Sequence, residues 1–356
     1  MKTESSRVLR HVNFVLFVGI ALNVSTAIAA TPREQRAIVQ HGIGGPEVLK
    51  FETAGVPEPG KNEVLIRVYA AAINPVDYKR RIGTGDYAPE PAALPTAIPG
   101  GDVAGVIEKV GGDVTAFRVG DPVFAVIPRD PKRLNGGYAQ FAVATTETVV
   151  AKPRNVTFAE AAGLGVAAVT AVRIVSVTKV AKGQRVLVTG AAGGVGSIAV
   201  QVAKERGAFV IGTASGRRAE YLRSIGVDQF VDYTKGNFED QIKDVDVVID
   251  TVGEDTATRA FKTLKKGGHY ISVAARGLER QCEAAGFKCP GRGNAQALPR
   301  EFYDETGRLA GSGKLSLYID KSFPLAQAAD AQVYSEQGRT QGKISLVVDA
   351  ENANRK

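Results

Sequence analysis

Cysteine and histidine, the residues that most often hold zinc in proteins, are scarce in this chain. Its 356 residues include two cysteines and three histidines, whereas a tetrahedral zinc site takes three or four ligands. Cys282 and Cys289 lie close together, but His41 and His269 are far apart in the sequence. The supply of ligands therefore argues against a zinc site. In an exported protein the two cysteines would close a short loop as a disulfide, and two free thiols are the alternative.

Long blocks of Lys and Arg are also missing. The formal net charge is +8 and is spread along the chain, so weak attraction to anions is expected and nucleic-acid binding is not. Tryptophan is absent, and the rest of the composition is that of a soluble globular protein. The length is sufficient for a large core and two domains.

The first 29 residues have the pattern of a targeting segment. Lys2, Arg7 and Arg10 precede the apolar run Val12–Val24, and Ala27-Ile28-Ala29 forms a small-x-small cleavage pattern. This predicts a signal peptide over 1–29 and an exported, periplasmic protein with no membrane contact after cleavage. An uncleaved anchor is the alternative, because about 19 residues nearly span a bilayer. The apolar run follows no Arg-Arg pair, so the twin-Arg route is not indicated.

A glycine-rich turn at 190–196 indicates dinucleotide binding. The apolar run Val186–Val188 reads as a buried strand, and Val195, Ile198, Ala199 and Val202 recur at helical spacing after the turn. A strand, a glycine turn and a helix in this order present free N–H groups to a pyrophosphate. A plain tight turn is the alternative. The expected contacts are Ala192, Gly193, Gly194, Val195 and Gly196.

The pattern of elements predicts an α/β fold. Residues 31–155 contain short β-branched runs between turns, and 156–176 is an Ala-rich helical stretch. Strand and helix patterns then alternate from 183, which is typical of a doubly wound parallel sheet. Residues 275–300 look like a loop. The tail returns to a helix over Leu325–Gln337 and a strand over Lys343–Val348.

The residues after the second expected strand favour NADPH over NADH. NAD-binding units place a carboxylate there to bond the ribose 2′-hydroxyl. Here the strand Phe209–Thr213 runs into Ser215, Arg217 and Arg218, with no carboxylate in that stretch. Guanidinium groups suit a 2′-phosphate. Two solvated arginines on a surface helix are the alternative, although cations in a first helical turn oppose its dipole.

Several motifs together resemble the zinc-independent, quinone oxidoreductase-like group of the medium-chain dehydrogenase/reductase superfamily. They are Ala72-Ile73-Asn74-Pro75-Val76-Asp77, Pro99–Gly105, Val119-Gly120-Asp121, Gly137-Tyr138-Ala139, Ala161–Ala171, Lys182–Gly196 and Gly342-Lys343-Ile344. The resemblance implies a GroES-like β-barrel domain from 31–155 and 306–356, and a Rossmann domain over 156–305. It also implies a substrate cleft where the two meet, and a homodimer formed through edge strands of the Rossmann sheets.

The same resemblance implies a reductase without zinc. Zinc-dependent relatives carry Cys in place of Asn74 and a His-Glu pair in place of Gly101-Asp102, and the stretch Val123–Gly136 has no cysteine. What remains is hydride transfer from NADPH to a quinone or an α,β-unsaturated carbonyl. An exported nucleotide-binding protein with no turnover is the alternative.

Site residues are expected by the same resemblance. The candidate catalytic or substrate-contacting residues are Asn74, Lys79 and Tyr87, and Asp77 is expected to brace its loop. Beyond the glycine turn, Ser215, Arg217 and Arg218, the expected cofactor contacts are Thr170, Tyr233, Val252, Gly253, Val273, Ala274 and Lys343.

Overall fold

The computed structural model describes residues 31–84, 96–253, 255–275, 277–291 and 298–356. The chain divides into a unit of Met1–Thr31 and a compact unit of Pro32–Lys356, and every element below belongs to the second unit. The predicted signal peptide and Tyr87 lie outside the described residues.

A seven-stranded sheet, here called the barrel sheet, collects strands from both ends of this unit. Its order is β14-β15-β3-β5-β6-β8, and β7 also pairs with β3. The strands are β3 (Glu63–Ile73), β5 (Asp102–Val110), β6 (Pro122–Val126), β7 (Phe141–Thr145), β8 (Val149–Ala151), β14 (Ile319–Pro324) and β15 (Lys343–Val347). The tail thus returns to the first half of the chain, because β15 pairs antiparallel with β3. A smaller sheet has the order β2-β1-β4, from Leu49–Gly55, Glu34–His41 and Thr96–Ala97.

The parallel sheet has the order β11-β10-β9-β12-β13, and each of its neighbouring pairs is parallel. Its strands are β9 (Arg185–Thr189), β10 (Phe209–Ala214), β11 (Gln229–Asp232), β12 (Val245–Asp250) and β13 (Leu264–Ser272). The apolar residues of β9 and β12 are fully buried, as strands covered on both faces require. Strand order reverses between β9 and β12, so their carboxyl ends border the crevice where such sheets bind ligands.

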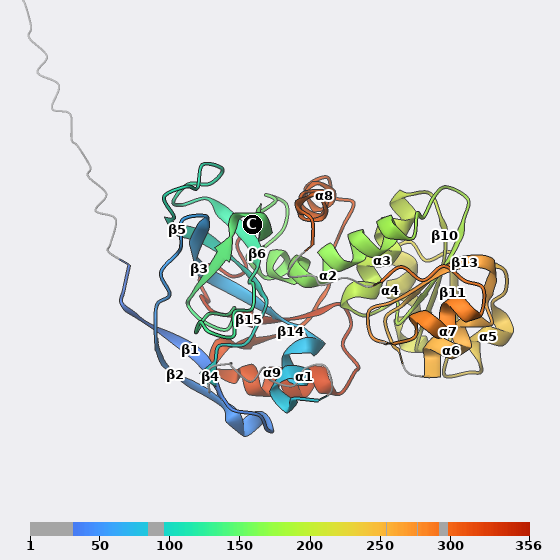
Figure 1. Ribbon diagram of the computed structural model, residues 1–356, viewed down its shortest axis with the longest axis horizontal. Coiled ribbons are helices and arrows are strands. Elements are labelled where there is room, and N and C mark those ends of the chain that lie inside the picture. The colour runs from blue at the N-terminus through green and yellow to red at the C-terminus, as the bar shows by residue number, and fades with distance from the viewer. Residues whose placement is uncertain (1–30, 85–95, 254, 276, 292–297) are drawn as a thin grey trace, which may run out of the picture. The chain divides into compact units, whose positions relative to one another are not determined.

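Helix α2 (Phe158–Val177) packs against strands of the barrel sheet and against α3 (Gly194–Glu205), the helix that follows β9. Thr157 and Glu160 form the capping box of α2, and its buried face joins residues of β3 and of α3 in one core. Figure 1 shows α2 between the barrel strands and the parallel strands. Among the described residues α2 is long and apolar enough to cross a membrane, but 83% of that stretch is buried inside the fold.

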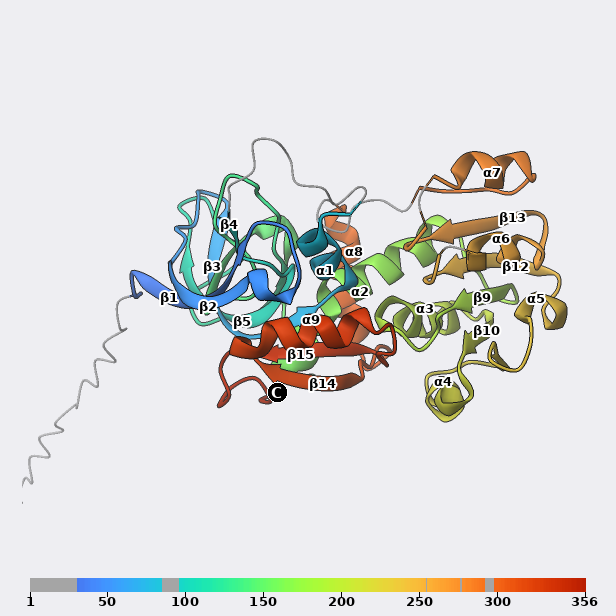
Figure 2. The same cartoon turned by 90° about the horizontal axis from the view of Figure 1, so that it is seen from below.

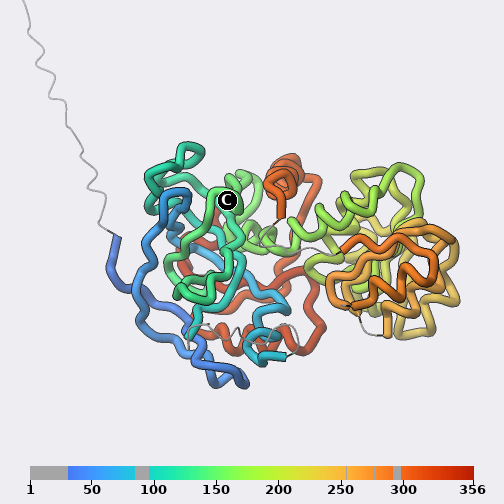
Figure 3. Tube along the Cα trace, in the orientation of Figure 1, coloured from blue at the N-terminus to red at the C-terminus, as the bar shows by residue number. Residues whose placement is uncertain are grey.

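The remaining helices are short. They are α1 (Pro75–Ile82), α4 (Ala219–Ser224), α5 (Phe238–Gln241), α6 (Asp255–Phe261), α7 (Glu279–Ala284), α8 (Arg300–Gly311) and α9 (Ala328–Glu336), with single 3₁₀ turns at Pro46–Val48, Thr146–Thr148, Gly216–Arg218 and Leu325–Gln327. Figure 2 shows α9 beside α1, and the two helices pack together. The Cα trace in Figure 3 follows the return of the tail to the first strands.

The structure corrects some sequence expectations. The stretch 275–300 is not all loop, because α7 forms within it and Cys282 is bonded to Cys289. The short segment around Lys288 then pairs with the outer edge of β13, because Tyr270 N–H donates to Lys288 O (2.9 Å) and Lys288 N–H donates to Gly268 O (2.8 Å). Helix α6 ends at Phe261, because β13 already begins at Leu264.

Candidate functional site

The glycine turn between β9 and α3 has the geometry of a phosphate-binding turn. Gly190 has φ +62°, and a Cβ on Gly196 would lie 2.3 Å from Gly190 O, so both positions require glycine. A Cβ on Gly193 would meet only Gly190 O, at 3.4 Å, so the backbone is accessible there. Helix α3 begins at Gly194, and the N–H groups of its first turn have no partner within the helix. These features fit a bound pyrophosphate.

The tail of the chain contacts this turn directly. Gly342 N–H donates to Ala192 O (2.8 Å), and Gly342 forms a parallel bridge with Gly193. Gly342 has φ +64°, and a Cβ there would lie 2.1 Å from Tyr318 O. Only glycine therefore allows this approach. The next residue, Lys343, begins β15 in the barrel sheet, so the phosphate turn is linked to the barrel sheet by two consecutive residues.

The arginines after β10 differ in their surroundings. Arg217 is exposed, and its guanidinium has no hydrogen-bonded or ion-paired partner in the part of the chain that the structure describes. Arg218 donates to Gln341 Oε1 and to Arg339 O, so it also holds the loop before β15. Ser215 precedes both as the N-cap of their 3₁₀ turn, without a side-chain capping bond.

A carboxylate that sequence reasoning missed lies beside these arginines. Asp232 ends β11, the strand next to β10, and its Oδ2 is 2.5 Å from where a Cβ of Gly216 would stand. Hydrogen bonds from Thr234 hold the pKa of Asp232 below its usual range, so it is charged at neutral pH. The stretch 214–218 has no carboxylate of its own, but the folded loop has one as a neighbour. Tyr233 follows it and is 55% exposed.

Asp250 joins the strand ends around the crevice. It is fully buried and accepts from Thr189 Oγ1 (2.6 Å), Tyr270 OH (2.9 Å) and Ser272 Oγ (2.9 Å). It also accepts from the N–H groups that follow β12, those of Val252 and Gly253 (both 3.1 Å). One carboxylate thereby fixes the loops after β9, β12 and β13 relative to one another, as buried polar networks do when every group is paired.

The cofactor contacts expected after β12 and β13 lie on the two loops that are bonded to Asp250 or to Ser272. Val252 is 49% exposed and Gly253 is buried with φ +80°. Gly253 lies against the loop after β13, because a Cβ on it would be 3.1 Å from the Ala274 Cβ. Val273 and Ala274 are half-buried, and Ser272 Oγ accepts from the N–H groups of Ala274 (3.2 Å) and Ala275 (2.8 Å).

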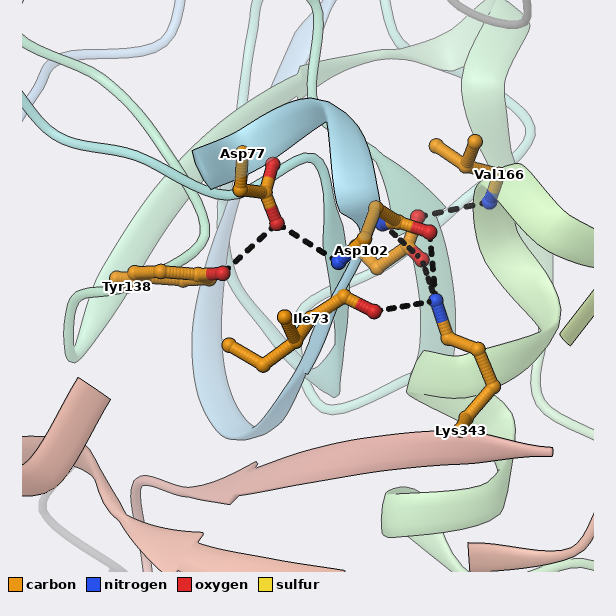
Figure 4. Close-up of polar contacts among 7 residues, drawn as sticks. Ile73, Asp77, Asp102, Tyr138, Val166 and Lys343 are labelled. Atoms are coloured by element: carbon orange, nitrogen blue, oxygen red, sulfur yellow. Dashed lines mark hydrogen bonds and ion pairs between the residues drawn. The ribbon is translucent and has the colours of Figure 1, made fainter. Parts of the chain in front are cut away.

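Three buried side chains beside the glycine turn form a polar cluster, and Figure 4 shows the hydrogen bonds around it. Lys343 Nζ donates to Asn74 Oδ1 (2.6 Å), Ile73 O (2.8 Å) and Asp102 Oδ2 (3.3 Å). Asn74 Nδ2 donates to Asp102 Oδ2 (2.9 Å), and Asp102 Oδ1 accepts from Val166 N–H (2.7 Å) in α2. Asn74, Asp102 and Lys343 are 5%, 0% and 4% exposed. We call Asn74, Asp102 and Lys343 the lysine cluster.

Asp77, in the first turn of α1, is a buried carboxylate next to the lysine cluster. It accepts from Asn74 N–H (2.9 Å) and from Tyr138 OH (2.7 Å), so it braces the start of α1. Burial raises the pKa of Asp77 to about 6, and burial raises the pKa of Tyr138 well above its usual range. Burial also raises the pKa of Asp102, against the opposing effect of the Lys343 charge.

The residues of the lysine cluster do not fit a zinc site. Asn74 Oδ1 and Asp102 Oδ2 both receive hydrogens from the Lys343 ammonium, so a positive charge is already bound to the oxygens that a metal would need. In the described part of the chain, no three or more His, Cys, Asp or Glu side chains come together as metal ligands.

The other predicted residues are less constrained. Lys79 lies half-buried in the last turn of α1, and Thr170 lies half-buried on α2, one turn after Val166. The structure does not bring Lys79 into the hydrogen bonds of the lysine cluster. Lys343, expected to contact the cofactor, has three oxygens of the protein within hydrogen-bond distance of its ammonium group. These roles stay predictions.

Sequence reasoning missed Asp250 and underrated Asp102. Both carry a signal that was available: Asp102 begins β5 just before an apolar run, and Asp250 ends β12 just after one. Burial of an acid there is costly unless hydrogen bonds compensate. The Asp102 carboxylate packs directly against Gly165 of α2, where a Cβ would lie 2.4 Å from Asp102 Oδ1.

Fold and site together define a dinucleotide-dependent oxidoreductase with a GroES-like domain and a Rossmann-like domain. Comparison with protein families agrees. Residues 60–154 match the alcohol dehydrogenase GroES-like domain, and residues 225–346 match a family described as zinc-binding dehydrogenase.

Known proteins are similar over nearly the whole chain. The chain is 38% identical to an NADPH-dependent alkenal/one oxidoreductase of Arabidopsis thaliana chloroplasts, over 91% of this chain and 82% of that protein. It is 34% identical to a Mus musculus quinone oxidoreductase, over 90% of this chain and 100% of that one. The structure of the quinone oxidoreductase from Coxiella burnetii matches with a TM-score of 0.82 at 32% identity, over 88% and 99% of the two chains.

The chain therefore belongs to the medium-chain dehydrogenase/reductase superfamily, in its zinc-independent, quinone oxidoreductase-like group.

Proposed function

We propose that this protein is an NADPH-dependent reductase of quinones or α,β-unsaturated carbonyl compounds that works without zinc. The observation that carries the proposal is the position of the lysine cluster. A phosphate-binding turn and an ammonium-centred polar cluster meet at Gly342 and Lys343, where a metal-dependent enzyme would need metal ligands. Relatives named for NADPH, alkenals, enones and quinones support the substrate class.

The chain's own residues fit NADPH. The N–H groups at the start of α3 would hold the pyrophosphate, and the exposed Arg217 would pair with the 2′-phosphate. Asp232 opposes that pairing through its negative charge. The preference for NADPH therefore depends on the arginines outweighing one nearby carboxylate.

The proposed reaction needs one hydride and one proton. When bound, NADPH would supply the hydride to the electron-poor carbon of the acceptor. The acceptor oxygen then gains negative charge, and a proton from water neutralises the enolate. Tautomerisation gives a hydroquinone from a quinone or a saturated carbonyl compound from an enone, with NADP⁺ as the other product. The second Nδ2 hydrogen of Asn74 would donate to that oxygen, since the first goes to Asp102.

Purified protein tests the proposal with a panel of quinones, enals, enones and enoyl thioesters. We expect NADPH oxidation with at least one class, matched by one equivalent of reduced product. Bound NADPH with no oxidation for any acceptor would contradict the proposal and support a nucleotide-binding protein without turnover.

We also propose that the protein is exported, on the pattern of residues 1–29. The disulfide Cys282–Cys289 supports an oxidising compartment. N-terminal sequencing of protein recovered from the periplasm checks this prediction. A mature chain that starts at residue 30 is expected, and an intact Met1 would contradict cleavage.

A further inference from the structure

Lys343 lies beside the glycine turn, but the hydrogen bonds of its ammonium group are to the protein itself. Its ammonium carries three hydrogens, and three protein oxygens lie within hydrogen-bond distance: Ile73 O, Asn74 Oδ1 and Asp102 Oδ2. The side chain is 4% exposed. It has no hydrogen left for a cofactor phosphate in this arrangement.

The stem of Lys343 is held between two helices. A Cβ on Gly194, at the start of α3, would lie 2.9 Å from Lys343 Cδ, and a Cβ on Gly163 in α2 would lie 3.5 Å from Lys343 Cβ. Glycine at position 194 makes room for the aliphatic chain, and Gly163 lies at ordinary contact distance from it. The ammonium is therefore directed past the phosphate turn and toward Asn74.

The contacts at Asn74 restrict its amide to one orientation. Asn74 Oδ1 accepts from Lys343, and Asn74 Nδ2 donates to Asp102, so a flipped amide would place oxygen against carboxylate and nitrogen against ammonium. A charged donor on the amide oxygen also strengthens the amide N–H as a donor, because linked hydrogen bonds polarise one another. The second Nδ2 hydrogen is thereby both oriented and strengthened.

We propose that Lys343 and Asp102 are positioning residues: they set the orientation and donor strength of Asn74 and do not bind the cofactor. The inference rests on the proposed function, since Asn74 acts there on the acceptor oxygen. Because Lys343 follows Gly342, which is bonded to the phosphate turn, the residue also links cofactor site and substrate site through the backbone.

The test uses the double variant K343M/D102N, which removes both charges and avoids leaving one buried charge unpaired. We expect kcat with 1,4-benzoquinone to fall at least tenfold, approaching the roughly 10²–10³-fold loss of a direct oxyanion donor. The dissociation constant for NADPH, read by its fluorescence, should stay close to that of the wild type. A lost ionic hydrogen bond to a phosphate would instead weaken binding about tenfold or more.

Two further variants make the result specific. K152M is the matched control, because Lys152 is also buried and bonded to carbonyl oxygens, at Pro153 and Val156, but lies outside the cluster; its kcat should match the wild type.

Adding K343M/D102N to N74A should lower kcat little further, because the pair acts through Asn74. If K343M/D102N unfolds at the assay temperature, K343Q/D102N replaces it, since glutamine keeps a polar group near Asn74.

The outcomes separate the inference from the proposed function. Weaker NADPH binding with unchanged kcat would show that Lys343 is a phosphate ligand and would overturn the inference, as would unchanged kcat with unchanged binding. A full additional loss in the N74A background would also overturn it. Absence of turnover in the wild type with every acceptor would instead contradict the proposed function, while NADPH binding by K343M/D102N still shows whether Lys343 binds the cofactor.

Discussion

At the scale of single residues, the two arginines after β10 differ in exposure and in hydrogen bonding. Arg217 is exposed and free to meet a 2′-phosphate, whereas Arg218 is bonded to Gln341 and to Arg339 O in the loop before Gly342. The sequence shows two equivalent cations in a row. Their difference arises from a loop more than 100 residues later in the chain, which local sequence does not reveal.

This difference predicts distinct effects on cofactor choice. R217A should raise the KM for NADPH about tenfold or more, the cost of a charge-assisted hydrogen bond to phosphate, and leave the KM for NADH nearly unchanged. R218A should raise both, because the loop beside the phosphate turn loses its anchor. R223A on α4 is the control for lost positive charge. Equal KM changes for both cofactors in R217A would refute NADPH recognition by Arg217.

Asp77 gives a pH-dependent prediction. Burial raises its pKa from 3.8 to about 6, so the folded state binds the proton more tightly than the unfolded state. The tighter proton binding by Asp77 stabilises the folded state fully below pH 3.8, and this stabilisation is lost as pH rises through about 6. The free energy of unfolding changes by about 3 kcal/mol over this range. D77N has no such titration. The free energy of unfolding of the wild type minus that of D77N should therefore fall between pH 4 and pH 7, in urea titrations, and a constant or rising difference would contradict the buried carboxylate.

At the scale of elements, α2 serves the site as well as the core. Its capping box is visible in the sequence, as Thr157 followed by Glu160. The purpose of Gly163 and Gly165 is not visible there, because their nearest neighbours, Leu317 and Asp102, come from the segment before β14 and from β5. Local propensity disfavours glycine inside a helix, and only the tertiary contacts explain why it is present.

G165A should therefore destabilise the protein although alanine is the better helix former. The new Cβ would lie 2.4 Å from Asp102 Oδ1, which displaces the carboxylate from Val166 N–H. We expect a loss of about 2–4 kcal/mol in urea unfolding. G311A at the end of α8 is the matched control, because its Cβ would meet only Pro153 Cβ, at 3.9 Å. Equal stability of the two variants would contradict the packing described for Asp102.

At the scale of the whole molecule, the fold class and the glycine turn could be predicted because they depend on patterns contiguous in sequence. The parallel sheet, α2 and the phosphate turn are of this kind. The lysine cluster is less accessible to sequence reasoning: its three members come from positions 74, 102 and 343, and their pairing requires β15 to lie beside β3. The family resemblance points to Asn74 as a catalytic candidate and to Lys343 as a cofactor contact, but the bonds between them are visible only in the structure.

The outer edge of the parallel sheet constrains how two copies of the molecule could assemble. The homodimer expected through Rossmann edge strands remains a prediction. On the outer side of β13, the segment around Lys288 is already paired, and the disulfide between Cys282 and Cys289 encloses it. A partner strand approaching β13 at Gly267–Tyr270 would meet this segment first.

NADPH-dependent reduction without zinc is tested most directly by one measurement. Purified protein is treated with a strong chelator, dialysed, and assayed for NADPH oxidation with 1,4-benzoquinone and with an enone. We expect the rate per molecule to equal that of untreated protein, and added zinc not to raise it. Loss of activity on chelation, with recovery on adding zinc, would contradict a zinc-independent reductase.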